Sequence, residues 1–166
     1  MAFEFTYDAL QQQENKLVLP AFNSKAAWEI GTLIIERARQ ESKAIAVSIT
    51  VARQNIFHYA FDGLGPDADN WIRRKSNVVY EYHRSSLLIG TKLAAENSSL
   101  EAHGRNPADF MVNGGSFPIR VIGAGVIGAI TVTGLPHLED HDYVTAALAE
   151  YLAQQAAQQR SFAERQ

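Results

Sequence analysis

The sequence predicts an α+β fold, in which helices cover an antiparallel sheet, and three observations predict it. Residues 45–52 alternate between apolar side chains and small or polar ones, which is strand spacing. Residues 113–135 hold two short apolar runs on either side of Gly123-Ala124-Gly125, which indicates a hairpin. Stretches with apolar residues at helical spacing lie before, between and after these strands. Strands joined by short turns must be antiparallel, so helices are expected to cover one face and complete a core.

The first 22 residues predict an N-terminal arm on a single domain of residues 1–166. A Gln-rich piece at residues 11–14 favours a short helix. Residues 17–20 favour an edge strand or extended arm, because Pro20 cannot donate a ladder hydrogen bond. Asn23 or Ser24 is then expected to cap a helix that runs to about residue 41, since short polar side chains accept from first-turn amides.

The middle of the chain predicts one more strand and several helices. Residues 53–55 are expected to form a turn and residues 56–61 a second strand. After a loop at 62–67, Asp67 or Asp69 is expected to cap a helix whose early part, residues 70–77, has the densest positive charge in the chain. Residues 84–86 end or kink that helix, residues 87–95 form another, and a helical turn is expected near residues 108–111.

The hairpin at residues 113–135 precedes the last helix. Gly123 and Gly125 fit a tight reversal between its strands, because glycine adopts backbone angles that bulkier residues resist. The final helix is expected from Glu139-Asp140 to about residue 160, with Val144, Leu148 and Leu152 on its buried stripe.

Composition excludes several classes of function. The net charge of −3 and the pI near 5.9 argue against a nucleic-acid partner. No apolar run is long enough to cross a bilayer and no leader peptide is evident, so we expect a cytoplasmic protein without a membrane partner. The absence of cysteine excludes disulfides, thiolate catalysis and cysteine-ligated metals.

Two stretches together carry a family likeness. The pattern GGSFPIRV…GVIGAITVTGLPHLEDHD resembles the GlcG-like, haem-degrading (HbpS-like) domain family. The stretch DNWIRRKSNVV…HRSSLLIG is similar to a narrower subfamily of small cytosolic proteins within it. The likeness covers roughly residues 17–155. It implies a profilin-like fold with a five-stranded antiparallel sheet flanked by helices, assembly into homo-oligomers, and haem as a candidate cofactor, but no particular reaction.

The charged helix start is the first candidate for a ligand site. Arg73, Arg74 and Lys75 point in three directions about 100° apart on a helix, so they cannot all meet one ligand. One or two of them could hold a carboxylate or phosphate, together with Asn77 one turn later. The others are expected to face solvent or to pair with Asp67, Asp69 or Glu81. The alternative is that they form structural ion pairs at a subunit or sheet contact.

The second wall of this predicted site comes from the hairpin entry. The backbone of Gly114 and Gly115 is open to close approach, and the helix from Trp71 to Asn77 is expected to face it. Ser85 and Ser86 could add hydroxyl groups to the pocket; the alternative is that they cap the next helix. The predicted ligand-binding set is Trp71, Arg73, Arg74, Asn77, Ser85, Ser86, Gly114 and Gly115.

Other chemistry has little support in the sequence. The five histidines lack metal-ligand spacing; His137 and His141 could join nearby carboxylates around a cation, but a solvated helix start is favoured. His83 and His103 are the candidate axial ligands for haem. No nucleophile elbow occurs, and Gly123–Gly128 spells GxGxxG between two strands instead of opening a helix.

Two functions therefore remain open. The first is an oligomeric cytosolic protein that binds a small anionic or tetrapyrrole ligand. A version of this hypothesis adds weak haem-degrading activity. The second is a non-enzymatic interaction module that uses the charged helix as a protein interface.

Overall fold

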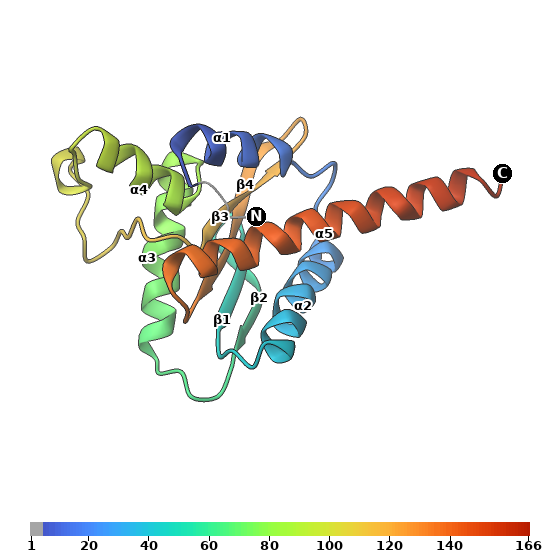
Figure 1. The fold of residues 1–166 in the computed structure, drawn as a ribbon, viewed down its shortest axis with the longest axis horizontal. Helices are drawn as coiled ribbons and strands as arrows, with labels where there is room; N and C mark the ends of the chain where they lie inside the picture. The colour runs from blue at the N-terminus through green and yellow to red at the C-terminus, as the bar shows by residue number, and fades with distance from the viewer. Residues whose placement is uncertain (1–4) are drawn as a thin grey trace.

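The computed structural model describes residues 5–166 and shows a sheet with helices on both sides (Figure 1). In chain order the elements are α1 (Tyr7–Lys16), α2 (Ser24–Gln40), β1 (Ala46–Val51), β2 (Gln54–Ala60), α3 (Asp67–Tyr82), α4 (Ser86–Ala95), a short 3-10 helix (Glu101–His103), β3 (Ser116–Val121), β4 (Gly125–Thr133) and α5 (His137–Ala163). The α+β class is confirmed. Residues 1–4 of the predicted N-terminal arm lie outside the described residues.

Within residues 5–166 the sheet has four strands in the order β2-β1-β4-β3, all antiparallel, and not the expected five. The segment expected as a further edge strand makes one isolated parallel bridge from Leu19 to Val121. Leu19 donates its N–H to the Arg120 carbonyl at 2.8 Å, and its own carbonyl accepts from Ile122 at 2.9 Å. Pro20 has no N–H, so it cannot extend the ladder. The profilin-like description stays a prediction.

The two faces of the sheet differ in side-chain size. Val47, Ile130 and Phe117 lie in the main core with residues of α2 and α5. The opposite face carries small or hydroxyl side chains such as Ser48 and Thr131, and α3 packs there. Helices α2 and α5 cover one face as expected, and small side chains let a third helix, α3, approach the other face closely.

The turns follow from backbone angles. The β1–β2 turn consists of Ala52 and Arg53, both at positive φ (49° and 67°), so Gln54 already pairs with Val51 and the predicted turn at 53–55 begins one residue late. In the β3–β4 hairpin, Gly123 and Gly125 have φ of 80° and 76°, which confirms their predicted role.

A second, smaller core joins α1 to α4. Leu10 from α1 packs with Val78 of α3 and Leu88 of α4. The N-terminal arm is therefore largely helical, as the Gln-rich piece predicts. The helical turn predicted near residues 108–111 lies slightly earlier, where the Phe110 amide donates to the Asn106 carbonyl at 3.0 Å, and a short 3-10 helix precedes it at Glu101–His103.

The cap of α3 differs from the prediction, and α5 begins two residues earlier than predicted, at His137. Asn23 caps α2 as predicted, by accepting from the Ala26 amide at 2.9 Å. The N-cap of α3 is Pro66 and that of α5 is Pro136, and neither has a side-chain cap, so the expected capping by Asp67 or Asp69 is wrong. The last turns of α5 project beyond the rest of the molecule (Figure 1). In the described part of the chain, every helix is too short or too polar to span a membrane.

Candidate functional site

Helix α3 separates two pockets of about 390 Å³ each. The first, which we call the apolar pocket, lies between α3 and the start of α5. Its lining residues are Leu64, Asp67, Ala68, Trp71, Lys75, Asn113, Thr133, Gly134, Leu135, Pro136, His137 and Asp140. The second, the polar pocket, lies between α3 and the β1–β2 hairpin. Its lining residues are Ser48, Thr50, Arg53, Asn55, His58, Asp69, Ile72, Arg73, Ser76, Asn77 and Tyr80.

The predicted arginines hold a loop in place. Arg73 forms an ion pair with Asp109 at 2.9 Å and donates to the Ala108 carbonyl at 2.8 Å. Arg74 donates to the Pro107 carbonyl at 2.7 Å, with its guanidinium 5.0 Å from the centre of the Trp71 ring. Neither pairs with the predicted carboxylates. Both arginines therefore have structural contacts, and only Arg73 also borders the polar pocket.

Asn77, like Arg73, binds the loop at Asp109. Its side-chain amide donates to the Asp109 carbonyl at 2.8 Å, so the two residues lie on one side of α3 as the helical spacing predicts. Both line the polar pocket. Arg74 does not line either pocket.

The two serines are structural. Ser85 is the N-cap of α4 and accepts from the Leu88 amide at 3.2 Å, which is the capping alternative. The Ser86 hydroxyl accepts from the Ser116 amide at 3.1 Å. Both side chains are fully buried and line neither pocket.

The two glycines of the hairpin entry lie behind the apolar pocket. Gly114 donates its N–H to Nδ1 of His137 at 3.1 Å. At Gly115, where φ is 128°, a Cβ would come within 2.8 Å of the Lys75 ammonium. Of the predicted set, Trp71 lines the apolar pocket, and Gly115 packs its backbone closely against the Lys75 amine. The structure thus divides the predicted single site into two.

Lys75 and Asp140 form an ion pair inside the protein that the sequence interpretation missed. Nζ of Lys75 lies 2.8 Å from an oxygen of Asp140, and each side chain is only 2% exposed. Lys75 also donates to the Val132 carbonyl and the Thr133 hydroxyl, at 3.2 and 3.4 Å. For Lys75 the structural ion-pair alternative therefore holds, with Asp140 as the partner in place of Asp67, Asp69 or Glu81.

A signal for this pair is present in the sequence. Lys75 is three residues after Ile72 and four before Val79, so it lies on the apolar stripe of α3. Asp140 stands four residues before Val144 on the stripe of α5. A charged residue on a buried stripe needs a partner, and these two helices supply opposite charges.

The surroundings shift both groups toward their neutral forms. Burial lowers the pKa of Lys75, while the Asp140 charge opposes that shift. Burial likewise raises the pKa of Asp140, against the charge of Lys75. The second oxygen of Asp140 accepts from the Leu135 amide at 3.1 Å, which fixes the carboxylate. The Lys75 amine donates to the other Asp140 oxygen at 2.8 Å, so the two groups share a direct hydrogen bond at the edge of the apolar pocket.

His137 borders the same pocket with a fixed tautomer. Its Nδ1 accepts from Gly114, so in the neutral ring the proton is on Nε2. Partial burial and the nearby Lys75 charge lower the pKa of His137, which keeps the ring neutral. His137 therefore offers an N–H donor, not a lone pair, to a ligand in the pocket.

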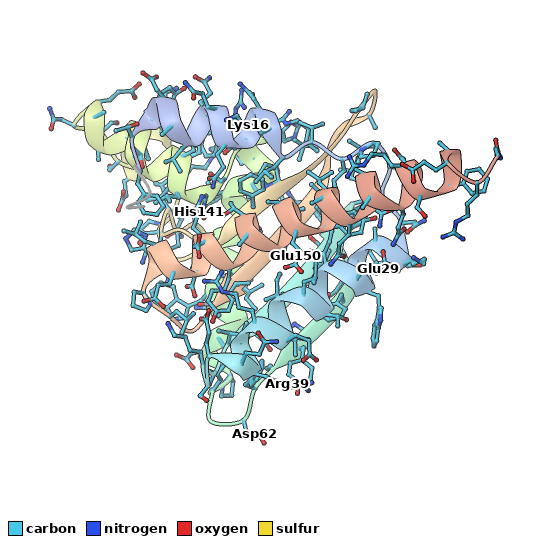
Figure 2. All side chains as sticks on the ribbon, turned by 45° about the vertical axis from the view of Figure 1, so that its right-hand side comes forward. Lys16, Glu29, Arg39, Asp62, His141 and Glu150 are labelled. Atoms are coloured by element: carbon cyan, nitrogen blue, oxygen red, sulfur yellow. The ribbon has the colours of Figure 1, made fainter. Side chains whose placement is uncertain are left out.

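His141 points the other way and is separate from His137. Figure 2 shows it on the side of α5 that faces α1, and its Nε2 lies 2.7 Å from the side-chain oxygen of Gln13. The two histidines therefore do not converge on a cation. Among residues 5–166, no three metal-ligating side chains lie close enough together to hold a metal ion.

The polar pocket has hydroxyl groups at its base and a cation at its rim. The side chains of Ser48, Thr50 and Ser76 are buried. The Thr50 and Tyr80 hydroxyls are hydrogen-bonded to each other. Arg53 lies over the Tyr80 ring, 4.7 Å from its centre, and has no carboxylate partner among the described side chains. The sequence interpretation placed Arg53 only in a turn, since nothing local indicates that its guanidinium reaches α3.

The residues present do not fit a histidine-ligated haem. An axial ligand needs a free nitrogen beside an apolar slot. In the apolar pocket, Nε2 of His137 carries the proton; in the polar pocket, His58 faces Asp69 at 3.5 Å. The two predicted ligands are surface residues: His83 is exposed at the end of α3, and His103 bonds the Ser98 hydroxyl.

Comparison with known proteins supports the resemblance. The sequence model of the family described as "Haem degrading protein HbpS-like" matches residues 22–149. A UPF0303 protein of Streptomyces coelicolor is 41% identical over 150 residues, which cover 90% of this chain and 95% of that relative.

Two solved structures share the fold. The Ybr137w protein superposes with a TM-score of 0.82 at 22% identity, over 89% of both chains. A PduOC–haem complex superposes with a TM-score of 0.66 at 17% identity, over 78% of this chain and 94% of that one. At these identities the likeness concerns the fold alone.

Proposed function

This chain belongs to the family of haem-degrading HbpS-like proteins, and we propose that it is a ligand-binding protein whose polar pocket takes a small organic anion through Arg53. The observation that carries the proposal is a guanidinium without a carboxylate partner at the rim of a pocket based on buried hydroxyl groups. A guanidinium suits carboxylate and phosphate because its donors match two oxygens at once.

The balance of charge favours an anion in the polar pocket over the apolar one. The polar pocket has Arg53 and Arg73 against one carboxylate, Asp69. The apolar pocket has Lys75 against two, Asp67 and Asp140. Arg73 is already paired with Asp109, so an anion entering the polar pocket would meet Arg53, which is unpaired within residues 5–166. The apolar pocket, with two carboxylates against one amine, would repel it.

The base of the polar pocket adds recognition of hydroxyl groups. Ser48 and Thr50 come from β1, Ser76 from α3, and Tyr80 lies beside Arg53. Hydroxyl groups both donate and accept, so they suit a polyol. The ligand class that this arrangement favours is a compact carboxylate or phosphate with several hydroxyl groups.

Calorimetric titration with ribose 5-phosphate tests this proposal, with ribose as the neutral control. We expect saturable binding of the phosphate compound and none of ribose. Arg53→Gln should weaken binding by more than about tenfold, because charge-assisted hydrogen bonds contribute roughly 1.5–3 kcal/mol. Arg39→Gln is the matched control: Arg39 also lies over a tyrosine, Tyr59, but outside the pocket. Equal affinity of Arg53→Gln and the native protein would refute the assignment.

Haem is tested separately, because the neighbour solved as a PduOC–haem complex binds it. Haemin titration of this chain should lack the Soret shift of a histidine-ligated iron. His137, which lines the apolar pocket, offers a protonated nitrogen, and His141, whose Nδ1 has no partner in the described chain, lines neither pocket. A saturable shift that disappears in His137→Gln or His58→Gln would overturn this expectation.

Self-association is the second candidate function, and exposed aromatic side chains favour it. Trp28 is 65% exposed and Phe162, on the projecting end of α5, is 66% exposed. The charged start of α3 is a poorer interface than expected, because Arg74 is held by Pro107 and Trp71. Light scattering after size exclusion should give a homo-oligomer whose mass falls in Phe162→Asp and is unchanged in Arg74→Ala. A cytoplasmic location stays part of this proposal.

A further inference from the structure

The apolar pocket contains an amine that the anion-binding role does not use. Nζ of Lys75 is enclosed by the Val132 carbonyl, the Thr133 hydroxyl and Asp140, all within hydrogen-bond distance. A lysine in such a place is unusual, because a buried ammonium loses its hydration. A structural ion pair needs no pocket beside it, yet this one borders a cavity of about 390 Å³.

The backbone packs closely against one side of the amine. Gly115 has no side chain, and a Cβ there would lie 2.8 Å from Nζ of Lys75. On the open side, Trp71, Leu64 and Leu135 give the pocket an apolar wall. A small molecule with an aromatic or aliphatic part can pack on that wall and reach Nζ with its polar end.

The carboxylate beside the amine is oriented for proton transfer. One oxygen of Asp140 accepts from the Leu135 amide, so the other is held toward Lys75 at 2.8 Å. His137, with its proton on Nε2, is a donor at the pocket edge for a carbonyl oxygen. These are the three groups that imine chemistry requires: an amine, a proton acceptor and a donor to the carbonyl.

We propose that Lys75 binds small neutral aldehydes covalently, as a reversible imine formed in the apolar pocket. Lys75 gives a proton to Asp140, and the lone pair of Nζ adds to the carbonyl carbon to form a carbinolamine. Asp140 then returns a proton to the hydroxyl group, which leaves as water while the C=N bond forms. Aldehyde and amine thus give imine and water, and no oxidant or metal is needed.

The charge of the pocket selects for a neutral aldehyde. Asp67 and Asp140 outnumber Lys75, so an aldehyde with a carboxylate or phosphate would be repelled. The site is therefore distinct from the polar pocket in both place and ligand class, and the two proposals stand or fall separately. The desolvation that lowers the pKa of Lys75 also increases its share of neutral amine at neutral pH.

Reductive trapping tests the proposal on the native protein. The protein is treated with benzaldehyde and cyanoborohydride, and the benzylated lysines are identified by peptide mass spectrometry. Lys25, whose side chain is 74% exposed, is the internal comparison. Burial lowers the pKa of Lys75 and so increases its share of neutral amine, and the pocket would hold the aldehyde beside it. Lys75 should therefore be labelled faster than Lys25 although it is far less exposed. Labelling that follows exposure, with Lys25 ahead of Lys75, would overturn the proposal.

Two tryptophan variants test whether the aldehyde reaches Lys75 through the apolar pocket. Trp71→Ala removes the apolar wall, and because Trp71 is only half-buried the fold should remain. Labelling of Lys75 should then fall toward that of Lys25, whereas Trp28→Ala, at an exposed tryptophan far from the lining, should leave it unchanged. Equal labelling of Lys75 in both variants would refute binding in the apolar pocket.

Discussion

His141 is a buried histidine whose removal should change how the stability of the protein depends on pH. Its side chain is 1% exposed, and Nε2 lies 2.7 Å from Gln13 Oε1. Nδ1 is buried without a hydrogen-bond partner in the described chain. A protonated ring would bury a second N–H with no acceptor. Burial, with a smaller contribution from His137, lowers the pKa of His141 to about 4.

The sign and size of the effect follow from that pKa. Below pH 6.5 the unfolded chain takes up a proton at this histidine and the folded chain does not, so stability falls as pH falls toward 4. With these two pKa values, the free energy of unfolding loses about 2 kcal/mol between about pH 7 and pH 5, and roughly 3 kcal/mol by pH 4.

Urea denaturation at about pH 7 and pH 5 measures this loss. His141→Gln keeps a side-chain amide for Gln13 but cannot titrate, so the variant should lose about 2 kcal/mol less than the native protein between the two pH values. His103→Gln removes an exposed histidine and should behave like the native protein. An equal loss of stability in native protein and His141→Gln would refute the reasoning, because another group would then carry the pH dependence.

Three further predictions concern packing and capping. Lys75→Met leaves the Asp140 charge buried without a partner, so it should lower the free energy of unfolding by about 3–5 kcal/mol in urea denaturation. The double variant Lys75→Met with Asp140→Leu should recover much of this loss, and a double variant no more stable than Lys75→Met would contradict the prediction. Gly128→Ala should prevent folding, because a Cβ would overlap the Thr50 carbonyl across the β1–β4 ladder; the readout is loss of the circular dichroism signal. The control Gly63→Asn, at an open site with φ of 91°, should fold. Ser85→Ala removes the cap of α4 and should lower stability by about 1 kcal/mol, whereas Ser161→Ala, near the exposed end of α5, should change it little; equal effects would count against capping.

Local patterns in the sequence determined most elements of the fold. Alternation at residues 45–52 predicted β1 and its division into an apolar and a small face, because strand geometry sends successive side chains to opposite sides. Gly123 and Gly125 predicted the reversal between β3 and β4, since few other residues adopt their backbone angles. Asn23 and Ser85 were predictable as helix caps, because their short polar side chains accept from amides of the first helical turn.

The site depended on contacts that no local pattern specifies. The sequence singled out Arg73, Arg74 and Asn77 for their charge and spacing, but their main partners are carbonyl groups and a carboxylate at residues 107–109, more than thirty positions along the chain. The reach of a long side chain is set by which loop packs beside it. The sequence therefore predicted charged residues on one helix, and the structure assigned them largely to holding a loop.

By itself, the sequence determined the α+β class, the family and the helix that borders both pockets, because these follow from periodicity and motifs within a few tens of residues. Only the tertiary structure decided which side chains meet. Lys75 and Asp140 are 65 positions apart and come within 2.8 Å because α3 and the start of α5 converge at the end of β4. Which residues far apart in the sequence come into contact depends on how the helices pack on the sheet. That packing brings the Lys75 amine to the apolar pocket, and no sequence motif identified it.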